Sequence, residues 1–205
     1  MIIMLSMVGP ALLIPLYVQN ALGLSALLSG LVIMPGAIIN GIMSVFTGKF
    51  YDKYGPRPLI FTGFILLISC TFLLCFLKVD TSYTYLIVIY AIRMFAVSLL
   101  MMPINTTGIN ALKTEDISHG TAIMNFGRVM AGSLGTALMV TFMSIGAQWV
   151  VSSSEHASKE MIQRQSVAVG VDVSFALVTV FVIIAFVLAL FIKEPNYSTH
   201  NSRKV

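Results

Sequence analysis

Charge is what this sequence has least of. Asp, Glu, Lys and Arg together make up 10% of the 205 residues, whereas a soluble domain carries about 25%. Hydrophobic residues make up 58%, and the mean hydropathy is +0.94. A soluble protein with so few charged residues would have too little polar surface to cover itself. The sequence is therefore that of an integral membrane protein.

Acidic residues are absent from the centre of every long apolar run. Seven of the eight lie in the polar segments between runs or after the last one, and Asp172 lies at the start of a run. Proton pumps use acidic residues placed inside the membrane. If a proton drives this protein, we expect the acid that carries it to lie elsewhere.

Motifs of enzymes and of metal or nucleic-acid sites are also missing. The sequence has no Walker loop, HExxH or GxSxG pattern, and no histidine has a neighbour at metal-ligand or triad spacing. Cys70 and Cys75 would be about 8 to 9 Å apart on a helix, which is beyond disulfide reach. The net charge of +4 comes without a basic face or a stacking module. We therefore expect no enzyme, no metal, no cofactor and no nucleic-acid partner.

Six apolar runs of about 20 residues remain, which is the length that spans a bilayer as a helix. They predict an all-α transmembrane fold of six helices with spans at about 2–19, 25–47, 58–77, 83–103, 119–143 and 171–192. Segment 144–170 is expected to be an interfacial or partly helical loop. Residues 193–205 are expected to form a polar tail.

The distribution of Lys and Arg predicts the orientation of the spans. Seven fall on one side of the predicted membrane: Lys49, Lys53, Arg57, Lys113, Lys193, Arg203 and Lys204. Three fall on the other side, at Lys78, Lys159 and Arg164. Because cytoplasmic loops carry the excess of basic residues, both termini are predicted to be cytoplasmic.

Two arginines lie inside the spans. Arg93 is roughly 15 Å from the start of its helix, which is too deep for its side chain to reach water easily. Inserting an arginine at the centre of a membrane helix costs about 2.5 to 3.5 kcal/mol. Arg93 should face the bundle interior or a wet cavity, as a pathway residue or as a structural donor to helix-end carbonyls. Arg128 lies nearer a helix end and shares a face with Asn125. With Met34 and Asn40 of the second run, these residues form the candidate substrate pathway.

Small residues recur every four or seven positions on two of the runs. Gly127, Ala131 and Gly135 form a small-xxx-small stripe on the fifth run, and Gly30, Ala37 and Gly41 lie on the second. Such residues let membrane helices approach each other closely. Pro15 and Pro35 are expected to kink the first two helices.

The charged turn between the second and third runs matches a known motif. Residues Gly48, Asp52, Lys53, Gly55 and Arg57 fit the pattern G-x-x-x-D-[RK]-x-G-x-[RK], which resembles the loop motif of the major facilitator superfamily. Two further stretches look like parts of the C-terminal half of the fourteen-span drug:proton antiporters of this superfamily, the EmrB/QacA type with its LmrB- and MdeA-like members. These stretches are PLYVQNALGLSALLSGLVIMPGAI and NFGRVMAGSLGTAL.

The resemblance implies a six-helix half-bundle of a multidrug efflux transporter in the bacterial cytoplasmic membrane. It implies export of hydrophobic, often cationic compounds, driven by the proton gradient, with two bundles alternating access to a central site. The matched loop residues would then form a gate. The excess of basic residues in cytoplasmic loops accounts for the Lys and Arg of this motif, but it does not account for Asp52. The N-terminal half, absent here, would supply the membrane acid. The alternatives are a non-transporting truncated remnant or scaffold, and a carrier of another small molecule.

Overall fold

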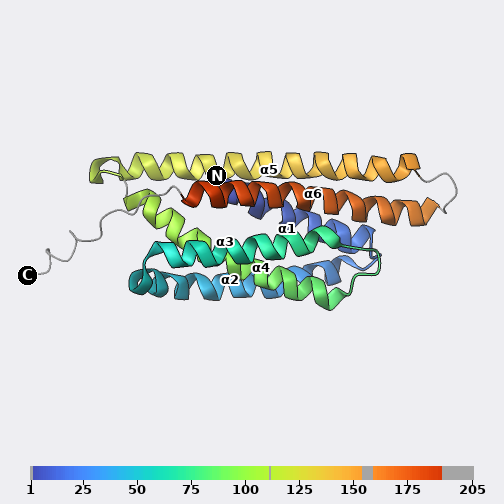
Figure 1. The fold of residues 1–205 in the computed structure, drawn as a ribbon, viewed down its shortest axis with the longest axis horizontal. Helices are drawn as coiled ribbons and strands as arrows, with labels where there is room; N and C mark the ends of the chain where they lie inside the picture. Colours follow the sequence, from blue (N-terminus) through green and yellow to red (C-terminus); the bar gives the residue numbers. More distant parts are fainter. Residues whose placement is uncertain (1, 111, 154–158, 191–205) are drawn as a thin grey trace, which may run out of the picture.

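The chain folds into long, roughly antiparallel α-helices that lie side by side (Figure 1). The computed structural model describes residues 2–110, 112–153 and 159–190, and within those ranges there are helices and no strands. The helices are α1 (Ile2–Asn20), α2 (Ala26–Tyr54), α3 (Pro56–Leu73), α4 (Tyr83–Asn110), α5 (Ile117–Ser153) and α6 (Lys159–Leu190), with short 3-10 turns η1 (Leu74–Phe76) and η2 (Thr114–Asp116). The predicted all-α fold is confirmed.

Five of these helices, α2 to α6, are long and apolar enough to cross a membrane, whereas the apolar part of α1, Met4–Asn20, is shorter. The α2–α3 turn, the α4–α5 connection and the end of α6 lie at one end of the bundle, which we name the Gly55 end (Figure 1). The α1–α2 and α3–α4 connections lie at the opposite end, the Gly23 end. Gly23 and Gly55 have φ of 68° and 78°, in the left-handed region that favours glycine.

The helices are longer than the predicted spans. α2 continues to Tyr54, α4 passes through Pro103 to Asn110, and much of segment 144–170 belongs to α5 and α6. Hydropathy marks the part of a helix that suits lipid, but backbone hydrogen bonding continues until a residue breaks it. At the end of α2 the break comes only at Gly55, and Pro56 then occupies the first turn of α3, where its missing N–H costs nothing. The predicted tail, 193–205, lies outside the described residues.

α4 is the innermost helix of the bundle. In the most apolar stretch of α4, 61% of the residues are buried, whereas the buried share of the corresponding stretch is 17% in α2 and 28% in α5. α4 packs mainly on α2 and α3, and α5 packs on α6 and α1. The core between them contains large side chains such as Tyr17, Phe64, Leu86, Leu100 and Phe175. One consequence is that α2 and α5 each have a long apolar face that no other described part of the chain covers.

Candidate functional site

Arg93 lies in the interior of the bundle, as expected from its position. Its side chain is fully buried, and Nη2 donates a hydrogen bond to the backbone carbonyl of Ser6 in α1. Pro10 stands four residues after Ser6 and has no N–H to donate to that carbonyl. Nε and Nη1 of Arg93 are buried without a hydrogen-bond partner among the described residues. The role of Arg93 in a substrate pathway stays a prediction.

Arg128 of α5 lies nearer the Gly55 end and reaches across to α4. Its Nη2 donates to Oδ1 of Asn105 over 2.8 Å. Asn125, one turn earlier on α5, is exposed. The sequence analysis missed Asn105 because the predicted span ended at residue 103, although α4 continues beyond Pro103. This hydrogen bond is one of the few links between α4 and α5.

The two candidates on α2 have different surroundings. Asn40 is half-buried and donates to the carbonyl of Met94 over 3.3 Å, directly beside Arg93 in sequence. Met34 is exposed on the outer face of α2. The five candidate pathway residues therefore do not form one cluster: Asn40 bonds to the backbone beside Arg93 at the middle of α4, whereas Arg128 bonds nearer the Gly55 end.

The small-residue stripe of α5 faces another helix of this chain. Gly127, Ala131 and Gly135 are buried, and a Cβ atom added at Gly135 would lie 2.8 Å from the carbonyl oxygen of Leu5 in α1. Backbone contact of this kind requires glycine.

The stripe of α2 faces none of the described helices. Ala37 is exposed, and a Cβ atom added at Gly30 or Gly41 would meet no atom within 4 Å. The close approach between α2 and α4 occurs instead at Gly36, where a Cβ atom would lie 2.8 Å from the ring of Tyr90. The packing role of Gly30, Ala37 and Gly41 stays a prediction about a surface outside this chain.

The predicted gating loop is mostly helix, so its description as a loop was wrong. Gly48, Asp52 and Lys53 lie in the last turns of α2, only Gly55 forms the turn, and Arg57 lies in the first turn of α3. The Gly55 N–H donates to the carbonyl of Tyr51 over 2.9 Å. Asp52 and Lys53 are exposed on the end of α2. The motif therefore presents its charges on rigid helix ends.

A polar cluster at the Gly23 end was also missed. Oδ1 of Asp172 accepts a hydrogen bond from the backbone N–H of Leu77 over 3.0 Å, and the hydroxyl of Tyr17 donates to the carbonyl of Lys78 over 2.5 Å. Asp172 had been expected at the start of its helix, but α6 begins at Lys159. These bonds tie α6 and α1 to the α3–α4 connection.

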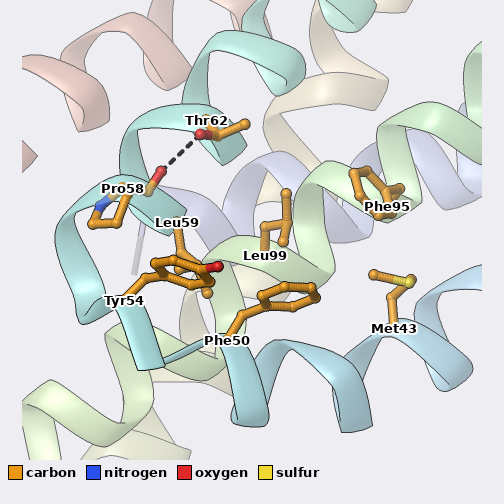
Figure 2. A pocket seen from close by; sticks show the side chains of 8 residues that line it. All are labelled: Met43, Phe50, Tyr54, Pro58, Leu59, Thr62, Phe95 and Leu99. Carbon is orange, nitrogen blue, oxygen red and sulfur yellow. Dashed lines mark hydrogen bonds between the residues drawn. The ribbon is translucent and has the colours of Figure 1, made fainter. Parts of the chain in front are cut away.

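An apolar groove of about 270 Å³ opens between α2, α3 and α4 near the Gly55 end. Figure 2 shows Phe50 and Tyr54 of α2 on one side, Thr62 of α3 across from them, and Leu99 and Phe95 of α4 between. No group of three or more His, Cys, Asp or Glu side chains that could hold a metal ion occurs in the described part of the chain.

Comparison with known proteins identifies the family. The family model of the Major Facilitator Superfamily matches residues 1–136. The chain is 37% identical over 185 residues to the lincomycin resistance protein LmrB of Listeria monocytogenes, which is 90% of this chain and 39% of that protein. With LmrB of Bacillus subtilis it shares 35% identity over 193 residues, 94% of this chain and 40% of LmrB.

With the multidrug export protein EmrB of Escherichia coli, identity is 29% over 134 residues, 65% of this chain and 26% of EmrB. The chain thus spans about two fifths of the length of the LmrB proteins that it matches. The match agrees with the resemblance read from the turn and helix motifs, and with the expectation that the protein is not an enzyme. The chain belongs to the major facilitator superfamily of membrane transporters and is related to its multidrug efflux proteins.

Proposed function

We propose that this chain is the second six-helix bundle of a proton-driven multidrug exporter in the bacterial cytoplasmic membrane, and that it transports only together with a first bundle. Its substrates would be hydrophobic, often cationic compounds. The relation to LmrB and EmrB supports the substrate class, and the share of LmrB that the chain spans supports the need for a further bundle.

The observation that carries this proposal is the uncovered face of α2. This helix is the least buried of the five long apolar helices, and its outer surface presents Gly30, Ala37 and Gly41, with no side chain of the described residues over the two glycines. Small residues on a membrane helix favour close contact with another helix. A helix of the first bundle would fit this face and could slide along it during alternating access.

In this proposal both bundles contribute residues to the gate, and the first bundle contributes the acid that carries the proton. Asp52 stands exposed at the Gly55 end, where a basic residue or a helix end of the first bundle would meet it when that side closes. Two carboxylates lie within the described apolar spans: Asp52 stands at the end of α2, and Asp172 accepts a hydrogen bond from the backbone N–H of Leu77 at the Gly23 end. The first bundle would therefore supply the acid that carries the proton.

Efflux measurements in cells test this proposal. The chain is expressed alone and together with the preceding six to eight spans of an LmrB relative, and efflux of the lipophilic cation ethidium is followed with and without a protonophore. Efflux only on co-expression, abolished by the protonophore, is expected. Absence of ethidium efflux in both cases would favour a non-transporting remnant or scaffold. If the cells instead take up or export only some other small molecule, in a protonophore-sensitive way, the chain would belong to a different carrier.

The interface is tested separately by co-purification of the two parts. Ala37→Leu and Gly41→Leu on the outer face of α2 should weaken the association, because each places a side chain where a helix must approach closely. Ser69→Leu on the exposed face of α3 is the matched control and should leave it unchanged. Equal association of all variants would contradict the assignment of this face.

A further inference from the structure

We propose that the groove between α2, α3 and α4 at the Gly55 end holds one acyl chain of an anionic phospholipid, with the lipid headgroup beside Lys53. The site would be a lipid-binding site, separate from the path taken by transported compounds. Its shape, its lining and the charges at its mouth each narrow the choice of occupant.

The groove exists because α2 and α3 each pack mainly on α4 and contact each other little. α4 forms the floor with Phe95 and Leu99, and the Gly55 turn joins the two walls at one end (Figure 2). Its volume of about 270 Å³ lies below the roughly 300 to 1,000 Å³ of pockets for drug-sized ligands. A narrow hydrocarbon chain fits this space better than a bulky drug.

The lining offers almost no polar atoms to an occupant. The hydroxyl of Thr62 already donates to the carbonyl of Pro58 over 2.7 Å. The remaining lining side chains are apolar or aromatic, and the Tyr54 hydroxyl is the one other oxygen among them (Figure 2). Burying a polar ligand without hydrogen-bond partners would be unfavourable. The occupant of the groove itself is therefore hydrocarbon.

A positive charge, that of Lys53, lies beside the lining of the groove. Nζ of Lys53 lies 5.1 Å from the ring centroid of Tyr54, which lines the groove, and Lys49 lies one turn earlier on α2. Asp52 is two residues from Phe50 and so points about 200° away from it around the helix. The lysines disfavour a cationic drug and favour an anionic headgroup, at the level where the apolar part of α2 gives way to charged residues.

Quenching of tryptophan fluorescence by brominated lipids tests the site in the full 205-residue chain. Phe95→Trp places a reporter on the floor of the groove, and Trp149→Phe removes the single native tryptophan. The protein is reconstituted into phosphatidylcholine vesicles that contain increasing fractions of brominated phosphatidylglycerol or brominated phosphatidylcholine. We expect phosphatidylglycerol to bind about fivefold more tightly than phosphatidylcholine, because one lysine near an anionic lipid surface contributes about 1 kcal/mol to binding. This preference should decrease at high salt, which screens the charges.

Three variants separate headgroup from acyl chain. Lys53→Gln should remove most of the fivefold preference, whereas Lys78→Gln, at the opposite end of the bundle, should leave it unchanged. Thr62→Phe fills the groove and should reduce quenching by both lipids. If the reporter variant does not fold, native mass spectrometry of the chain with Phe95 intact counts retained phosphatidylglycerol, and Lys53→Gln should lose it.

Several outcomes would overturn the proposal. Equal binding of the two lipids would remove the headgroup site, and a preference that survives Lys53→Gln would place that site elsewhere. Quenching that Thr62→Phe leaves unchanged would show that the acyl chain does not enter the groove. Absence of quenching by either lipid would mean that another part of the protein covers it.

Discussion

Arg93 of α4 donates a hydrogen bond to the backbone carbonyl of Ser6 in α1. In an unbroken helix the N–H of residue 10 would donate to this carbonyl, but residue 10 is proline. A defect in one helix thus provides the acceptor for a buried charge on another. The pairing joins the two halves of the bundle, since α1 packs on α5 and α6 whereas α4 packs on α2 and α3.

The first prediction concerns this pairing. Pro10→Ala restores a helical N–H and should stabilise α1 by up to about 3 kcal/mol. With Arg93 present the gain should be smaller by about 1 kcal/mol, because the new N–H competes for the Ser6 carbonyl. A double-mutant cycle with Arg93→Met, measured by unfolding of the purified chain in detergent, checks this. Effects that add within about 0.3 kcal/mol would mean that the pairing carries no energy.

The second prediction separates the two roles considered for Arg93. Arg93→Met removes a buried charge whose Nε and Nη1 have no hydrogen-bond partner among the described residues, so the melting temperature should not fall by more than about 2 °C. If Arg93 belongs to the pathway, export by the assembled transporter should nevertheless be lost. Both quantities are measured on the same variant. A large fall in melting temperature with export retained would make Arg93 a structural donor.

The third prediction compares glycines on the two small-residue stripes. Gly135→Ala places a Cβ atom 2.8 Å from the Leu5 carbonyl oxygen, so α5 must move away from α1, at a cost of about 1 to 3 kcal/mol. Gly41→Ala is the matched control: its Cβ meets nothing within 4 Å, and alanine favours the helix by up to about 1 kcal/mol. Unfolding in detergent measures both. Equal destabilisation would contradict the packing of α5 on α1.

The fourth prediction concerns the gate. Asp52→Asn should abolish export by the assembled transporter while the amount of protein in the membrane stays unchanged, because an exposed carboxylate contributes little to the fold of this chain. Asp80→Asn, an exposed carboxylate at the opposite end, is the control and should export normally. Immunoblots of membranes and ethidium efflux provide the two readouts. Normal export by Asp52→Asn would remove its gating role.

Hydropathy and charge were enough to predict a membrane protein built from helices. Apolar runs of bilayer length have no other stable backbone arrangement in lipid than the helix or the closed barrel, and these runs show no strand alternation. The turn motif at Gly48 to Arg57 predicted the family together with the two stretches that resemble drug antiporters, because the residue types and spacing of all three are specific in combination. The central arginine also had to face inward, since lipid does not tolerate it.

The helix ends depended on contacts and breakers that hydropathy does not report. α4 passes Pro103 and brings Asn105 to Arg128, a pair that a span ending at residue 103 concealed. The turn expected between the spans that end at residue 47 and begin at residue 58 is reduced to Gly55, because nothing before Gly55 breaks the hydrogen bonds of α2. Charges expected on a loop therefore stand on helix ends.

What the sequence by itself determined is the class of structure: which segments leave water, where charge is tolerated, and which family motif the chain carries. Only the tertiary structure decided which face of each helix meets which neighbour. Gly36 rather than Gly30 or Gly41 meets α4, Pro10 provides the acceptor for Arg93, and three helices leave a groove beside Lys53. The reason is physical: in an apolar span every face suits lipid, so hydrophobicity cannot choose the partner, and close packing does.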